Sequence, residues 1–293
     1  MRYPRVLGVL LAATACTTAL ADWNVGDPHV MHFPQVDKNA SGQLAYDVNV
    51  SLAPGLRHGW VADDWQASKT TAVTGIHIWG GWYDNHRRPG AGYTDHGTFQ
   101  LSIYDTAPTG GPGALLWTQD FTAGSYKTRL APNSAATQWL DPGWPIPSNF
   151  AGETYQINFS IAASSAFVQQ QGQMYWLAVN NTVDVNGDGM IDMSDIMASQ
   201  FFGWRNTGLH FGADAVHAPG TSLMLPPTAP PVTGWTTLPD PDGMPRFDMA
   251  FVVTPAPGTL AAVACFGTVL ARRRREGVSG RSNGPEPTRD DRG

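Results

Sequence analysis

Two segments of the chain show a clear alternation of apolar and polar residues. Thr98–Tyr104 reads Thr-Phe-Gln-Leu-Ser-Ile-Tyr, and Thr154–Ile161 reads Thr-Tyr-Gln-Ile-Asn-Phe-Ser-Ile. Successive side chains of a β-strand point to opposite faces of its sheet, so this pattern predicts strands with one face against a core and the other toward water. Helical periodicity is scarce between residues 23 and 253.

The rest of this body has the same character. Short runs rich in β-branched and aromatic residues alternate with Gly, Pro, Asn and Asp, which is typical of strands joined by turns. Strands are expected at Leu44–Leu52, Ala72–Trp79, Thr98–Tyr104, Ala114–Phe121, Glu153–Ile161, Met174–Val179, Phe201–Arg205, Gly234–Leu238 and Arg246–Val253. Many short strands with irregular connections predict an all-β fold, an antiparallel β-sandwich of jelly-roll type over residues 22–253.

The first 21 residues have the three parts of a secretory signal peptide. Arg2 and Arg5 form a charged start, and Val6–Leu20 is mostly apolar and small. Residues 19–21 (Ala-Leu-Ala) supply the small residues of a cleavage site. We therefore expect an apolar signal helix, export across the inner membrane, and a mature chain that begins near Asp22.

The other end of the chain has the make-up of a sorting signal. Pro255 and Pro257 precede an apolar run, Leu260–Ala271, which is shorter than the roughly 20 residues of a stable membrane span. Four arginines follow: Arg272, Arg273, Arg274 and Arg275. Such a basic flank stays on the cytoplasmic side of a membrane.

These features resemble the PEP-CTERM sorting signal, with Ala256 where that family has Glu. The resemblance implies recognition by an exosortase-type membrane protease and membrane association through residues 254–275. It also implies a place in a Gram-negative cell envelope or on the cell surface, often with exopolysaccharide. Residues 276–293 are expected to be a disordered tail.

Composition narrows the classes of protein. The chain has 293 residues and a net charge of −6, and its two ends are more basic than its body. The body has no basic stripe, which argues against nucleic-acid binding, and its acidity favours cations over polyanions. Both cysteines, Cys16 and Cys265, lie in the apolar terminal segments. Thiol nucleophiles and cysteine-based zinc sites are therefore not expected in the body.

The sharpest motif is Asp-Val-Asn-Gly-Asp-Gly-Met-Ile-Asp-Met-Ser-Asp at residues 184–195. It matches an EF-hand-type loop, in which oxygen atoms at positions 1, 3, 5, 7, 9 and 12 surround Ca²⁺ and Gly189 at position 6 permits the sharp turn. The expected ligands are Asp184, Asn186, Asp188, the backbone carbonyl of Met190, Asp192 and Asp195.

This loop also resembles the calcium loop of dockerins, because it closes on Asp195 rather than on Glu. A dockerin carries two loop–helix units and this chain shows one, so we expect a structural calcium site, with residues 182–200 as a loop–helix insertion. A partner-docking half-module and a metal-free acidic turn are the alternatives. The insertion lies between two expected strands, Met174–Val179 and Phe201–Arg205, that we assign to one sheet, so Ca²⁺ would order their connection.

Asp63 and Asp64 form a weaker candidate site. Neighbouring residues of a strand face opposite ways, so both carboxylates reach one substrate or cation only from a loop. A solvated turn and a structural hydrogen-bonding role are the alternatives to catalysis or cation binding.

Aromatic residues next to this region are candidates for stacking on sugar rings, above all Trp82 and Tyr83. Trp79 is expected in the core instead, since it follows Ile76 and Ile78 in an apolar strand. We expect Gly80-Gly81 to end that strand in a turn.

Enzyme motifs are scarce. The chain has no H-E-x-x-H motif, no G-x-S-x-G elbow and no P-loop, and Glu153 is the only Glu of the body, so a glycosidase would need Asp residues. Residues 58–65, 75–82, 99–104 and 247–251 resemble an uncharacterised domain of secreted bacterial surface proteins, which implies an export domain without assigning a reaction. The sequence therefore predicts an exported, non-catalytic, calcium-stabilised protein, with a carbohydrate-binding module or a glycan hydrolase as the alternatives.

Overall fold

The fold is known from a computed structural model that describes residues 22–36, 45–51, 59–83, 97–131, 137–142, 144–148, 153–182, 201–218, 234–239, 241 and 247–255. Within these residues the regular elements are strands, and none is a helix. No helix of this part of the chain could therefore cross a membrane. The predicted all-β class is confirmed.

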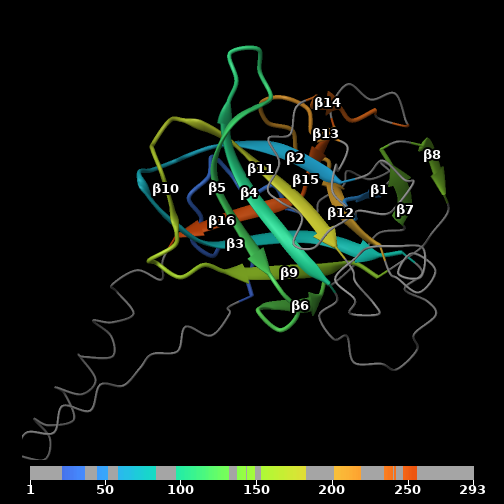
Figure 1. The fold of residues 1–293 in the computed structure, drawn as a ribbon. Coiled ribbons are helices and arrows are strands. Elements are labelled where there is room, and N and C mark those ends of the chain that lie inside the picture. Colours follow the sequence, from blue (N-terminus) through green and yellow to red (C-terminus); the bar gives the residue numbers. More distant parts are fainter. Residues whose placement is uncertain are drawn as a thin grey trace, which may run out of the picture.

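The strands form two sheets (Figure 1). The larger follows the order β6-β9-β3-β12-β1-β7-β8, with β10 and β16 paired to β3 and β15 paired to β12. Its strands are β1 (Ala45–Asn49), β3 (Thr71–Trp82), β6 (Tyr126–Leu130), β7 (Thr137–Asp141), β8 (Trp144–Ser148), β9 (Tyr155–Ser160), β10 (Phe167–Gln169), β12 (Phe202–Thr207), β15 (Asp248–Met249) and β16 (Phe251–Pro255).

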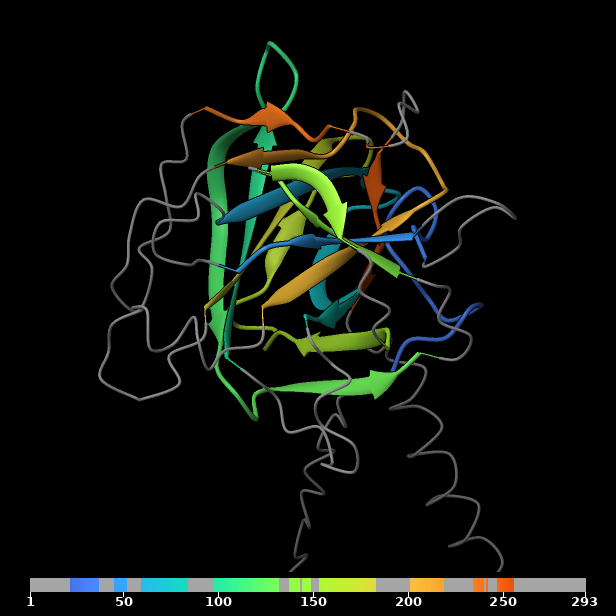
Figure 2. The same ribbon diagram turned by 90° about the vertical axis from the view of Figure 1, so that its right-hand side faces the viewer.

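The smaller sheet follows the order β14-β13-β2-β11-β4-β5. Its strands are β2 (Trp60–Gln66), β4 (Thr98–Thr106), β5 (Pro112–Phe121), β11 (Met174–Thr182), β13 (Val216–Ala218) and β14 (Thr236–Thr237). Figure 2 shows the long β4–β5 hairpin at one side of the molecule, with β6 and β9 side by side below.

Strand pairing departs from the prediction in one place. The paired strands of the described residues are antiparallel except β1 and β7, which run parallel with Ala45 opposite Thr137. The larger sheet is thus mixed. A parallel pair needs a long connection between its strands. Here the connection from β1 to β7 contains β2 to β6, so no local sequence pattern predicts this parallel pairing.

Two glycines explain a second difference. Gly80 and Gly81 continue β3 to Trp82 instead of ending it, and they pair with Trp204 and Gly203 of β12. A Cβ atom on Gly80 would lie 2.1 Å from the carbonyl oxygen of Gly203. The glycines therefore serve the close approach of two central strands rather than a turn.

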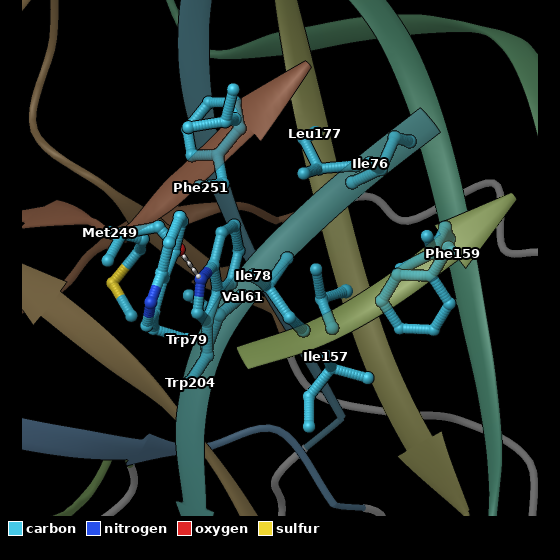
Figure 3. Packing of buried hydrophobic residues seen from close by; sticks show 14 of the residues in the cluster. Val61, Ile76, Ile78, Trp79, Ile157, Phe159, Leu177, Trp204, Met249 and Phe251 are labelled. Carbon is cyan, nitrogen blue, oxygen red and sulfur yellow. Dashed lines mark hydrogen bonds between the residues drawn. The ribbon is translucent and has the colours of Figure 1, made fainter. Parts of the chain in front are cut away.

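The two sheets share one hydrophobic core. Figure 3 shows Ile76 and Ile78 of β3 beside Ile157 and Phe159 of β9, with Leu177 of the smaller sheet among them. These side chains are fully or almost fully buried. The alternation in β9 therefore predicts its inner face correctly.

The polar face of β9 is not in water, as the alternation suggests, but buried. Gln156 and Asn158 are each 1% exposed, because the segment Asp22–Asn24 covers them. The outer face of the smaller sheet carries a second hydrophobic cluster, which includes Tyr104 and Trp176, and Trp235 packs against it.

Candidate functional site

The candidate sugar-stacking aromatics are not on an open face. Trp82 is 2% exposed, and its ring lies edge-on to Tyr155 and Phe202, with ring centroids 5.5 and 5.1 Å away. Tyr83 is half-buried and lies 5.0 Å from the ring of Trp139. The structure thus places Trp82 in the core together with Trp79. Trp82 and Tyr83 therefore do not form a flat, exposed platform for a sugar ring.

Asp63 and Asp64 lie on β2, not on a solvated turn, and both are buried. The carboxylate of Asp63 accepts hydrogen bonds from the backbone N–H of Met249 at 2.7 Å, from that of Asp64 at 2.8 Å and from Gln35 Nε2 at 3.3 Å. Asp64 accepts one from the backbone N–H of Ala213 at 2.9 Å. The pair therefore ties β2 to segments far away in the sequence.

Further carboxylates gather beside this pair. Asp248 on β15 is buried; it accepts hydrogen bonds from the backbone N–H of Phe211 at 2.6 Å and faces His210 Nδ1 at 3.1 Å. Asp214 accepts one from the backbone N–H of Phe247 at 3.1 Å. We call the set Asp63, Asp64, His210, Asp214 and Asp248 the acidic cluster.

The segment between β12 and β13 brings two members of the acidic cluster into place. Gly212 has φ +69°, and a Cβ atom there would lie 2.3 Å from Asp64 Oδ1 and 2.5 Å from Oδ2. Only glycine adopts this backbone conformation at little cost and leaves room for the carboxylate. The turn therefore rests directly on Asp64, with His210 and Asp214 on either side of Gly212 in the chain.

Burial dominates the electrostatics of the acidic cluster. It raises the pKa of Asp63 well above its usual range, and the negative charges of Asp248 and Asp64 add to this effect. Burial likewise raises the pKa of Asp64 to about 7 and that of Asp248 to about 6, although hydrogen bonds from backbone N–H groups and the charge of His210 oppose it. Carboxylic acids with such pKa values can hold or exchange protons near neutral pH.

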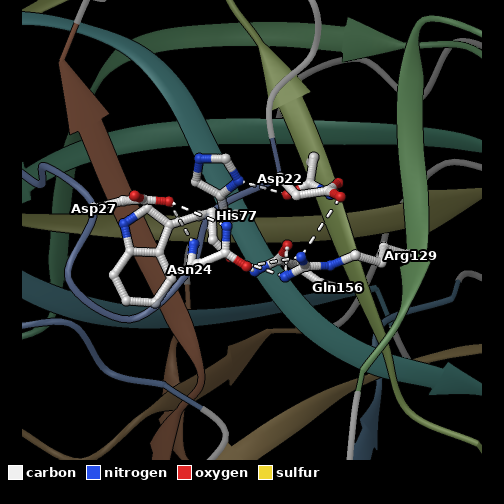
Figure 4. A network of polar contacts seen from close by, with 8 residues as sticks. Asp22, Asn24, Asp27, His77, Arg129 and Gln156 are labelled. Carbon is white, nitrogen blue, oxygen red and sulfur yellow. Dashed lines mark hydrogen bonds and ion pairs between the residues drawn. The ribbon is translucent and has the colours of Figure 1, made fainter.

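A second polar set lies on the outer face of β3 and β9 (Figure 4). Arg129 of β6 donates to the backbone carbonyl of Trp23 at 2.9 Å, to Asn24 Oδ1 at 2.8 Å and to Gln156 Oε1 at 2.9 Å. It also forms an ion pair with Asp22 at 3.5 Å. Arg129 thereby fastens the segment Asp22–Asn24 to the body.

His77 extends this set, which we call the amino-terminal network: Asp22, Trp23, Asn24, His77, Arg129, Gln156 and Asn158. Asn158 Nδ2 donates to Asp22 Oδ1 at 3.1 Å, so the Oδ1 atom of Asn158 is left to accept a hydrogen bond from the N–H at Nδ1 of His77, 2.6 Å away. The other ring nitrogen of His77 lies 3.4 Å from Thr254 Oγ1. Burial lowers the pKa of His77 to about 4, so its ring is neutral at neutral pH.

Residues 183–200 and 256–293 lie outside the described residues, and so do residues 1–21. The expected calcium ligands, the signal peptide, Pro257 and Arg272–Arg275 therefore remain predictions. One neighbouring expectation is wrong: β11 and β12, which flank the calcium motif, belong to different sheets. Pro255 is the last residue of β16 and pairs with Val73, and its part in a sorting signal stays a prediction.

Sequence reasoning missed Asp214, Asp248 and the role of His210 and Arg129. Asp248 lies in residues 247–251, one of the segments that resemble a domain of secreted proteins, and this resemblance was the signal that could have pointed to Asp248. The acidic cluster combines three segments distant in the sequence, so no spacing rule points to it. Arg129 has no motif around it, and its partners lie on another strand and in the segment 22–24.

Comparisons with known proteins give one match. Residues 31–254 match the family described as a domain of unknown function, DUF7901. No curated protein matches the chain, and no solved structure matches it. Because the match spans most of the sequence and contains the whole acidic cluster, the chain belongs to the DUF7901 family.

Proposed function

We propose that this protein is an exported, non-catalytic protein of the cell envelope or extracellular matrix, held near the membrane by its C-terminal segment. The observation that carries the proposal is the docking of Asp22–Asn24. The residues that follow the expected cleavage site are bound into the body by Arg129, Gln156 and Asn158, with Trp23 4% exposed. The folded domain thus includes the first residues of the expected mature chain.

The surroundings of the candidate catalytic residues support a non-catalytic role. Both oxygens of Asp63 accept hydrogen bonds from backbone N–H groups, and its side chain is 0% exposed. A general acid or base needs a path to a substrate proton, which a carboxylate enclosed in this way does not offer. The burial of Trp82 argues in the same way against the carbohydrate-binding alternative.

The body is proposed to be a β-sandwich of jelly-roll type stabilised by Ca²⁺. The shared core of the two sheets supports the sandwich. Residues 184–195 connect β11 of one sheet to β12 of the other, so an ion bound there would order the passage of the chain between sheets. Support for Ca²⁺ itself comes from the oxygen-rich spacing of the motif.

Fractionation of cells that express the full chain tests the export proposal. We expect the protein in the envelope fraction, with a mature N-terminus at or close to Asp22 by N-terminal sequencing. Deletion of residues 260–275 should release it into the medium. A protein that keeps Met1 and stays in the cytoplasm, or a deletion variant that remains cell-associated, would contradict the proposal.

Thermal unfolding in EDTA and in Ca²⁺ tests the calcium site. Ca²⁺ should raise the melting temperature of the wild type, because a ligand that binds only the folded state stabilises it. Asp188→Ala should abolish this rise, whereas Ser194→Ala, at a loop position that supplies no ligand, should keep it. Identical melting curves of the wild type in EDTA and Ca²⁺ would rule the site out.

A further inference from the structure

We propose that His210, Asp214 and Asp248, with Asp64 beside them, form a binding site for a divalent transition-metal ion of the Zn²⁺ type. One ring nitrogen of His210 and one oxygen each of Asp214 and Asp248 lie within 4.8 Å of one another. Two ligands of a tetrahedral Zn²⁺ ion, with bonds of about 2.0–2.1 Å, are about 3.3 Å apart. The 3.1 Å separation of His210 Nδ1 and Asp248 Oδ1 is close to that value.

Asp64 supplies an independent indication of a ligand. Its side chain is 3% exposed, and within the described part of the chain its Oδ1 atom has no hydrogen-bond partner. The turn at Gly212 presses against this oxygen, between His210 and Asp214 in sequence. A buried carboxylate oxygen without a donor is costly. Asp248 and His210 are close enough to Asp64 for their charges to act on it, so a cation bound by these two residues would offset the charge of Asp64.

Charge balance points the same way. Asp64, Asp214 and Asp248 lie together with Asp63. Among the described residues, the basic side chain that the structure places against these carboxylates is His210, whose Nδ1 lies 3.1 Å from Asp248 Oδ1. Buried carboxylates in folded proteins are usually paired with cations or coordinate metals. A divalent ion would also join β2, β15 and the segment 210–214, which are distant in the sequence.

The donor set selects the class of metal. Ca²⁺ and Mg²⁺ prefer shells made of oxygen atoms, whereas an imidazole nitrogen combined with carboxylates suits Zn²⁺ and similar ions. The site is also accessible, since the side chain of His210 is 25% exposed and Asp214 is half-buried, while Asp248 lies behind them. An ion could therefore enter from the His210 side. This site is separate from the motif at 184–195, which offers only oxygen ligands.

Zn²⁺ binding to the full chain, stripped with EDTA and dialysed free of it, tests the proposal. Zn²⁺ at about 100 times its Kd should raise the melting temperature by about 5–10 °C. His210→Gln and Asp214→Asn should each weaken Zn²⁺ binding at least about tenfold, and the second keeps an acceptor for the N–H of Phe247. The matched control is Asp120→Asn, an exposed carboxylate on β5, which should bind Zn²⁺ as the wild type does.

Co²⁺ gives a readout that is independent of stability. Bound at the site, it should show the visible absorption of a low-symmetry, low-coordinate ion, and His210→Gln should remove this signal. Equal Zn²⁺ shifts in wild type and His210→Gln, or Co²⁺ that keeps the spectrum of the hydrated ion, would overturn the proposal. If Ca²⁺ but not Zn²⁺ raised the melting temperature, and if His210→Gln abolished that rise, the proposed class of metal would be refuted. Loss of the Ca²⁺ response in Asp188→Ala, with the Zn²⁺ response intact, would confirm that the two sites are distinct.

Discussion

The amino-terminal network and the acidic cluster are both polar sets, but they differ in exposure and in charge. Asp22 and Asn24 are exposed and the side chain of Arg129 is 33% exposed, whereas Asp63, Asp64 and Asp248 are buried. In the network, one guanidinium donates to three acceptors and pairs with Asp22. In the cluster, four carboxylates gather around one histidine, which contacts Asp248, and accept from several backbone N–H groups. A partly exposed set in which one cation donates to several acceptors fastens a segment, whereas a buried set of like charges is held together by the rest of the fold and retains affinity for protons and cations.

The largest expected effect comes from breaking the network at its donor. Arg129→Met should lower the free energy of unfolding by about 2–3 kcal/mol, because it removes the donor to the side chains of Asn24 and Gln156 and one of the two donors to the carbonyl of Trp23. Urea unfolding measures this loss. Lys127→Met is the control, since Lys127 is an exposed neighbour on β6 and should change stability by less than about 0.5 kcal/mol. Equal losses in the two variants would show that Arg129 is not the anchor.

His77 gives the network a dependence on pH. Its pKa is about 4 in the folded protein and about 6.5 in the unfolded chain, so protons bind the unfolded state more readily between these values. Its contribution to stability is therefore present above about pH 6.5 and is lost as the pH falls toward 4. Between pH 7 and pH 5, His77→Gln should therefore lose about 2 kcal/mol less stability than the wild type loses.

Denaturant unfolding at the two pH values measures this difference. Burial also lowers the pKa of His32 to about 4, so the variant should keep part of the acid sensitivity. A pH profile of His77→Gln identical to that of the wild type would show that His77 does not contribute.

The smallest expected effect tests the opposite character of the acidic cluster. Asp64→Asn in EDTA at pH 8 should leave stability unchanged or raise it by about 1 kcal/mol. The substitution removes a negative charge beside Asp248 while its amide oxygen still accepts from the N–H of Ala213. Because the pKa of Asp64 is raised to about 7, the cost of its charge appears as the pH rises and fades toward pH 4, and the gain should fade with it.

Urea unfolding at pH 8 and pH 5 measures this change. A loss comparable to that of Arg129→Met would mean that the acidic cluster stabilises the fold as the amino-terminal network does.

The sequence predicted those parts of the fold that a single segment determines. The alternation of residues 154–161 indicated β9 and its inward face correctly. It could not indicate that Gln156 and Asn158 are buried, because the segment that covers them lies more than a hundred residues earlier in the chain. Coverage of a polar face is a tertiary property, and alternation alone describes it as a solvent face.

The candidate site shows the same limit. Asp63 and Asp64 were identified as a pair, but two adjacent carboxylates are more typical of a turn than of a buried strand, so β2 was missed. Their partners Ala213 and Met249 come from remote segments. Gly80 and Gly81 illustrate a local signal with two meanings, since glycine suits both a turn and the close contact with Gly203.

One consequence concerns the two ends of the folded domain. Asp22 reaches His77 through Asn158, and Thr254 reaches the other side of the same ring. In addition, the backbone N–H of Val30 donates to the carbonyl of Val253 at 2.9 Å. The chain thus enters and leaves the folded domain at neighbouring positions. A short peptide could therefore join residues 22 and 255, and the chain could be reopened in a surface loop to give a circular permutant.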